Sequence, residues 1–264
     1  MSYTDNCKTY RQDIIDRFEP AYVIENFFNE KEIEKLIKYQ FKNAKRVKAR
    51  PSSGNIQSVI SVQRMMKNLK WLDDKFKAVF GEYNWIQTGN YYITIRHHDA
   101  HVDLISDEEA ENPVFDQNIP FKSVVFPLYL SPIDAECYTA FMHQRRIGHA
   151  ATFDRGSVSK QEYSSYKLFR EYNGFIDING NAMPSENDSA DWSAERYPTI
   201  TKENFSGFSE EIVFKQRVGD IMVFDACQVH ASCQLDGTSD RWLKNGMNIQ
   251  FYKTVEPTIV EPTQ

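Results

Sequence analysis

After residue 90 the chain is built mainly of short β-type segments separated by turn-forming residues, and this pattern restricts the fold more than any other feature. The segments are rich in β-branched and aromatic residues, which fit a pleated, half-buried surface. Clusters of Pro, Gly, Asn and Asp separate them, as between the strands of a β-layer. The pattern predicts a β-sandwich or jelly roll, with strands at 90–96, 121–130, 137–142, 211–216, 220–226 and 247–253.

The N-terminal third of the chain has a helical pattern instead. A β-rich run at 21–28 leads into a helix, with Asn29 as its N-cap and Glu32 three residues later, as in a capping box. A second helix is predicted over 64–80. The apolar residues that recur at steps of three and four are expected to face the core: Ile33, Leu36, Ile37 and Phe41 in the first helix, and Met65, Leu69, Leu72, Phe76 and Val79 in the second. The predicted class is therefore α+β, mainly β, with a jelly-roll core backed by N-terminal helices.

We expect the 264 residues to form a single domain, because no repeat or low-complexity linker divides them. Residues 1–20 are predicted to be an N-terminal extension. Residues 154–208 interrupt the series of strands with a polar stretch that includes a possible helix at 160–172. A long insertion in a compact β-fold is typically a binding element, so we predict that 154–208 forms a lid.

Composition and charge argue against several classes of function. The net charge of −6 disfavours nucleic-acid binding, which needs a positive field. The sequence has no run of about 18 apolar residues, so it predicts no membrane span, and its N-terminus lacks the apolar stretch of a signal peptide. The four cysteines, Cys7, Cys137, Cys227 and Cys233, show no CxxC spacing. We expect a soluble cytoplasmic protein whose cysteines are reduced and act as small buried hydrophobes.

The segment RHHDAHVD at 96–103 concentrates three of the six histidines. It contains two H-x-D triplets, His97 to Asp99 and His101 to Asp103. Residues two apart on a strand point to the same side, so each triplet can direct an imidazole and a carboxylate at one ion. Two histidines and one carboxylate on one coordination face suit Fe(II) and leave positions open for substrates.

The third ligand is expected from GDIMVFDACQVH at 219–230. A turn at 219–220 precedes a strand with core-facing apolar residues, and His230 follows near its far end. Arg241 stands eleven residues later, and a hairpin joining the two strands would return it to the same barrel. Its planar guanidinium fork suits the end of a dicarboxylic acid.

The order H-x-D, G-D-x-x-x-F-D, H and then arginine resembles the Fe(II)/2-oxoglutarate-dependent dioxygenase superfamily. The branch is either phytanoyl-CoA dioxygenase-like, which the TSDRW run at 238–242 resembles, or prolyl-hydroxylase-like. The run at 21–37 is similar to the strand-and-helix opening of many members, and 121–142 to their central pair of strands. The resemblance implies a double-stranded β-helix that uses Fe(II), O2 and 2-oxoglutarate. It also implies hydroxylation of a small-molecule substrate, with decarboxylation of 2-oxoglutarate to succinate.

The resemblance assigns the metal ligands to His101, Asp103 and His230, and the distal carboxylate of 2-oxoglutarate to Arg241. We prefer His101 and Asp103 to the other triplet because they leave a complete strand at 90–96 before the ligands. In the family's halogenating members a small residue replaces the carboxylate, so Asp103 favours oxygenation.

Three further residues lie near the co-substrate in the implied fold and are predicted to hydrogen-bond it: Tyr92, Thr94 and Lys122. A basic cluster after the central strands is interpreted as a solvated turn or as a site for an anionic substrate; it comprises His143, Arg145, Arg146 and His149.

Another class of function fits the same segments. A cupin-like jelly roll could bind a metal or another ligand without any 2-oxoglutarate chemistry. The sequence predicts neither the substrate nor the oligomeric state.

Overall fold

The structure is a computed structural model. It describes residues 15–43, 45–46, 56–59, 61–83, 85–86, 90–94, 118–131, 136–145, 175–183, 191–197, 202–205, 207–233 and 243–254. Within these ranges the protein is an α+β structure of two mostly antiparallel sheets with a few helices. No helix in the described ranges has the length and apolar character needed to span a membrane.

The larger sheet has eight strands among the described residues. Its longest strands, β6 and β13, pair along nearly their whole length. The order is β1 (Tyr22–Ile24), β11 (Ile221–Asp225), β6 (Asn118–Ser131), β13 (Leu243–Thr254), β5 (Asn90–Thr94), β3 (Ile56–Val59) and β2 (Lys45–Arg46), with β4 (Trp85–Ile86) paired to β13.

The smaller sheet has five strands among the described residues, and β7 is its centre. The order is β10 (Glu210–Lys215), β7 (Tyr138–Arg145), β8 (Phe175–Ile176) and β9 (Ala182–Met183), and β12 (Gln228–Cys233) also pairs with β7. Between β6 and β13 the chain passes repeatedly from one sheet to the other, so each sheet contains strands that are far apart in the sequence.

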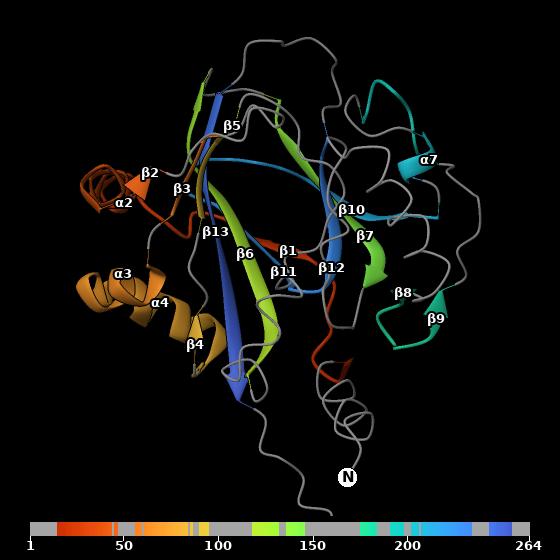
Figure 1. Ribbon diagram of the computed structural model, residues 1–264, viewed down its shortest axis with the longest axis horizontal. Helices are drawn as coiled ribbons and strands as arrows, with labels where there is room; N and C mark the ends of the chain where they lie inside the picture. Colours follow the sequence, from red (N-terminus) through yellow and green to blue (C-terminus); the bar gives the residue numbers. More distant parts are fainter. Residues whose placement is uncertain are drawn as a thin grey trace, which may run out of the picture.

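Helices cover the outward face of the larger sheet, as Figure 1 shows. They are α2 (Glu30–Asn43), α3 (Val62–Asn68) and α4 (Lys70–Phe80), and a short α7 (Lys202–Phe205) lies beside the smaller sheet. Asn29 and Glu32 exchange side-chain-to-main-chain hydrogen bonds of 3.0 and 2.9 Å, which confirms the predicted capping box.

The alternation of side chains along the strands produces three apolar clusters. Val124 and Phe126 of β6 face the helices, whereas Ala140 and Val229 line the outward face of the smaller sheet. A smaller cluster lies between the sheets, where the rings of Phe141 in β7 and Phe224 in β11 are 4.9 Å apart. The protein is therefore a sandwich with two apolar outer faces and a separate interior.

All six predicted strands are present in the described ranges, with shifted ends. The β-rich run at 21–28 is a strand only over Tyr22–Ile24, since the chain turns at Asn26, whose φ is +52°. The single helix predicted over 64–80 is wrong: the chain forms α3 and α4, which meet at Leu69 with φ −116° and ψ 66°.

Two residues predicted to face the core are exposed. Phe41 is 79% exposed and Val79 is 37% exposed, whereas Gln40 is buried in α2 by hydrogen bonds with Asn245. At the C-terminal end of α2 the buried residue is thus Gln40, one position before the Phe41 that the apolar periodicity predicts.

The described parts of the 154–208 insertion extend and cover the smaller sheet. The β8–β9 hairpin pairs with β7, and Tyr197, Phe205 and Phe208 pack on its outward face. The possible helix at 160–172 lies outside the described residues, and the lid remains a prediction.

The described cysteines agree with the sequence analysis. Cys137, Cys227 and Cys233 are free and buried, whereas Cys7 lies outside the described residues.

Candidate functional site

His230 lies on β12, on the side that faces the larger sheet. Its neighbours Val229 and Ala231 belong to the outward cluster, so alternation directs His230 to the opposite side. There its ring centroid is 4.6 Å from that of Phe224 and 6.0 Å from that of Phe141. The imidazole is thus buried between the sheets and contacts an aromatic ring from each.

A main-chain contact sets the tautomer of His230. Its Nδ1 atom lies 3.1 Å from the main-chain oxygen of Gln228. A carbonyl oxygen can only accept, so Nδ1 donates to it, and in a neutral ring the lone pair would be on Nε2. Metal-binding histidines are held in this way, with one ring nitrogen donating to a carbonyl and the other binding the metal.

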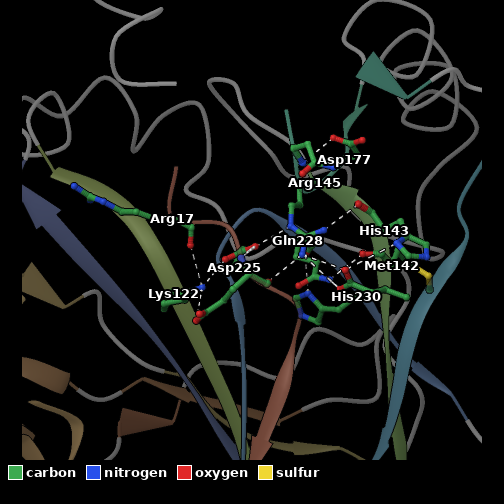
Figure 2. A network of polar contacts seen from close by, with 12 residues as sticks. Arg17, Lys122, Met142, His143, Arg145, Asp177, Asp225, Gln228 and His230 are labelled. Carbon is green, nitrogen blue, oxygen red and sulfur yellow. Dashed lines mark hydrogen bonds and ion pairs between the residues drawn. The ribbon is translucent and has the colours of Figure 1, made fainter. Parts of the chain in front are cut away.

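A group of buried charged side chains lies next to His230, where β11 turns into β12 (Figure 2). Asp225 accepts hydrogen bonds from Lys122 Nζ at 2.7 Å and from Arg145 Nε at 2.8 Å. Arg145 Nη2 is also 3.4 Å from both carboxylate oxygens of Glu211. We call these four residues the inner charge cluster. Its two cations and two carboxylates compensate one another, as buried charges must.

The segment just before β1 binds to the inner charge cluster. Arg145 Nη2 donates to the main-chain oxygen of Glu19 at 3.1 Å, and Glu19 N donates to Asp225 at 3.3 Å. The Glu19 carboxylate lies 2.8 Å from Lys122 Nζ. Burial, with added repulsion from Glu19 and Asp225, raises the pKa of the nearby Tyr22 to about 12. The N-terminal segment is therefore fixed across this end of the sandwich.

A further buried cation comes from β13. Asn245 exchanges hydrogen bonds of 3.0 and 2.8 Å with Gln40 of α2, so Lys244, its neighbour, projects to the inward side. Lys244 is 2% exposed, and burial lowers its pKa, an effect that the nearby Cys137 partly opposes. A desolvated ammonium favours the approach of an anion. Sequence reasoning missed Lys244 because no motif distinguishes it from the other lysines.

The structure describes only some of the sequence-predicted site residues. His101, Asp103 and Arg241 lie outside the described residues, as do His97 and Asp99.

Tyr92 and Thr94 are on β5, where Thr94 is the register partner of Lys244. The ammonium of Lys122 contacts Asp225, the Glu19 carboxylate and the main-chain oxygen of Arg17, which account for its three donors.

No protein-family model matches the chain, and no curated protein matches it.

Several solved structures are similar to it at low identity. One is the non-haem α-ketoglutarate-dependent epimerase SnoN from nogalamycin biosynthesis, with 8% identity, a TM-score of 0.45, and 96% of this chain and 88% of that chain covered. A prolyl-4-hydroxylase from Pseudomonas putida has 10% identity and a TM-score of 0.43, covering 92% of this chain and 98% of that chain. HygX from Streptomyces hygroscopicus, with nickel and 2-oxoglutarate bound, has 14% identity and a TM-score of 0.42, covering 94% and 86%. At this level of similarity, function has to be argued from the residues of the chain itself.

The structure corrects three expectations. His230 and the start of β13 are not joined by a hairpin, because β12 belongs to the smaller sheet and β13 to the larger one. Arg145 is not part of a solvated turn: it ends β7, is 0% exposed and pairs with Asp225. The central pair 121–142 is likewise divided between the two sheets, as β6 and β7.

Among the described residues, no group of three His, Cys, Asp or Glu side chains converges on a common point. His230 is the one proposed ligand within them. Its buried position and its Nδ1–H tautomer fit a neutral nitrogen donor to a borderline ion such as Fe(II).

Proposed function

We propose that this protein is a non-haem Fe(II)- and 2-oxoglutarate-dependent oxygenase that hydroxylates a small molecule. The observation that carries the proposal is the buried position of His230 and the hydrogen bond that its ring makes. The histidine that the sequence motif selects lies between the two sheets, and its Nδ1 donates to the main-chain oxygen of Gln228, so Nε2 is the ring nitrogen that would bind a metal. This hydrogen bond supports the proposal because metal-binding histidines are oriented in the same way.

The proposed iron ligands are His230 together with His101 and Asp103. When bound, the iron and 2-oxoglutarate activate O2, which yields succinate, CO2 and a hydroxylated product. The protein's part is to hold these groups and to keep water away from them. Phe141 and Phe224 exclude water from the sides of the imidazole that they contact.

The co-substrate needs a cation for the carboxylate that lies far from the iron. We propose Arg241 for this contact, because its planar fork matches a carboxylate. We propose Lys244 as a second cation for the co-substrate. It is a buried ammonium on the inward side of β13, three residues after Arg241. Thr94, its register partner, remains a proposed hydrogen-bonding residue with Tyr92, whereas the donors of Lys122 are already used.

We also propose that the sandwich is a double-stranded β-helix, or jelly roll. The alternation of β6, β7, β11, β12 and β13 between two antiparallel sheets supports this topology.

Metal binding and co-substrate turnover test the proposal. The purified protein, supplied with Fe(II), ascorbate and 2-oxoglutarate, should form succinate. His230→Ala and His101→Ala should each abolish tight Co(II) binding, with Co(II) used as an air-stable substitute for Fe(II). Arg241→Ala should leave Co(II) bound and weaken 2-oxoglutarate binding, measured by calorimetry.

The two H-x-D triplets supply the matched control. His97→Ala should leave Co(II) binding unchanged, and the opposite result for His97 and His101 would move the ligands to the first triplet. Metal binding without any succinate, and with no effect of Arg241→Ala on ligand binding, would favour the cupin-like alternative.

A further inference from the structure

Glu211, a member of the inner charge cluster, is connected to His230 through Gln228. We infer that Glu211 is a positioning residue for His230 and acts through Gln228. This inference rests on the proposed function, since it assigns a role at the same metal site, and neither residue was selected by the sequence motifs.

Gln228 is held by contacts with two other strands. Its Nε2 donates to the main-chain oxygen of Met142 in β7 at 2.9 Å and to Glu211 Oε2 in β10 at 2.5 Å. Its own main-chain oxygen receives Nδ1 of His230 at 3.1 Å. The side chain of Gln228 therefore fixes the first residue of β12, and its carbonyl orients the imidazole.

The two acceptors determine which way the Gln228 amide points. Both partners of Nε2 are oxygens that can only accept, so the reversed amide would place Oε1 against them. Gln228 is 0% exposed, and within the described part of the chain Oε1 has no hydrogen-bond partner. The orientation that satisfies both acceptors therefore leaves Oε1 unpaired among the described residues, and the carboxylate of Glu211 and the carbonyl of Met142 together direct it.

The backbone of β10 explains why Glu211 reaches the interior. The register between β10 and β7 shifts between Glu210 and Ile212, which leaves Glu211 at an irregularity of the strand. Arg145 contacts Glu211 from the interior, and Asp225 in turn holds Arg145. Charged and polar contacts thus connect Asp225 to the ring of His230 through Arg145, Glu211 and Gln228. Figure 2 labels Asp225, Arg145, Gln228 and His230.

Glu210, the residue before Glu211, makes its contacts on the other face of the sheet. It binds Arg196 and the hydroxyl of Tyr197, which belongs to the outward cluster. It therefore offers a matched control: an adjacent, half-buried carboxylate in the same strand, with no contact to Gln228 or His230 among the interactions of the described residues.

The experiment measures Co(II) affinity and the His230 tautomer in the full-length protein. We expect Glu211→Gln to weaken Co(II) binding about tenfold, since partners that orient a ligand contribute about 10- to 100-fold to metal affinity. Glu210→Gln should stay within twofold of the wild type. In the metal-free protein, the ¹⁵N shifts of the His230 ring should report Nδ1–H in the wild type and in Glu210→Gln, and a tautomer mixture in Glu211→Gln.

Gln228→Met tests the same link without removing a partner of Arg145, and so serves if Glu211→Gln does not fold. It should weaken Co(II) binding to a similar degree. Combining it with Glu211→Gln should add little, because both act on one path.

Affinity within twofold of wild type in either Glu211→Gln or Gln228→Met, with Co(II) lost in His230→Ala, would overturn the inference and leave the proposed function intact. A wild-type protein that binds no Co(II) would instead remove the proposed function, and this inference with it.

Discussion

The outward faces of the two sheets and the space between them are equally buried but differ in chemistry. Phe126 and Ile249, which face the helices, are 0% exposed and contact apolar side chains. Arg145 and Asp225, in the interior, are also 0% exposed, but they belong to a group of paired charges. The outer faces therefore resemble an ordinary core, whereas the interior carries groups that are costly to bury.

This difference shows where stability and function are concentrated. Burying apolar side chains stabilises the fold, whereas a buried ion pair contributes little and is often replaceable by apolar residues without loss. Perturbed and buried ionisable groups are concentrated at functional sites. His230 and Lys244 are both buried in the interior, where a site between the sheets would have to lie.

The largest effect is expected from breaking the inner charge cluster. Asp225→Asn removes the carboxylate that pairs with both Lys122 and Arg145, whose side chains are 6% and 0% exposed. Glu19 and Glu211 still face these two cations, but removing the one buried carboxylate that binds both should lower the free energy of unfolding by about 3–5 kcal/mol, measured by urea denaturation.

Asp220→Asn, at the other end of β11, is the control. Asp220 accepts a hydrogen bond from Asn26 N at 2.8 Å, and an asparagine oxygen can still accept it. The expected loss is about 1 kcal/mol or less. Equal losses at both positions would mean that the inner charges are no more tightly coupled than this single part-buried hydrogen bond.

Lys244→Met should have a smaller effect, and of opposite sign. Burial lowers the pKa of Lys244 in the folded protein, so the unfolded chain binds more protons between that pKa and the unfolded value of about 10.4. Stability due to this group therefore rises with pH across this window, and the cost of burial is fully present below it. Methionine removes the cost and should raise the free energy of unfolding at pH 7 by on the order of 1 kcal/mol.

The same variant should bind 2-oxoglutarate more weakly, measured by calorimetry in the presence of Co(II). Urea denaturation between pH 7 and 10 should show a flatter pH dependence than in the wild type. A variant that is less stable at pH 7 would indicate that the buried ammonium stabilises the folded state, contrary to the division between the two regions.

The sequence was sufficient to predict the main strands and the fold class. Strands such as 121–130 and 220–226 carry long runs of β-branched and aromatic residues, and their pairing only extends or trims the ends. The sequence was less able to predict to which of the two sheets each strand belongs. Only Ala226 and Cys227 separate β11 from β12, and neither is a residue type that indicates a turn. His230 was therefore expected at the end of the preceding strand.

The site shows the same limit. The spacing of 219–230 selected His230, but the residues that orient it, Gln228 and Glu211, carry no local pattern and meet only through the pairing of β10, β7 and β12. Arg145 was interpreted from its basic neighbours, whereas its actual partner, Asp225, is 80 residues away. Contacts of this kind depend on strand order, which apolar periodicity does not encode.

Phe41→Ser should have the smallest effect and tests the outer boundary of the helix-facing core. Phe41 is 79% exposed, and Ser and Phe have similar helix propensities, so the free energy of unfolding should change by less than about 0.5 kcal/mol. Leu36→Ala, in the same helix at 0% exposure, should cost about 2–5 kcal/mol. Urea denaturation of both variants compares them directly. A loss at Phe41 close to that at Leu36 would mean that the outward side of α2 is covered in solution, which would extend the apolar outer core beyond the two faces described above.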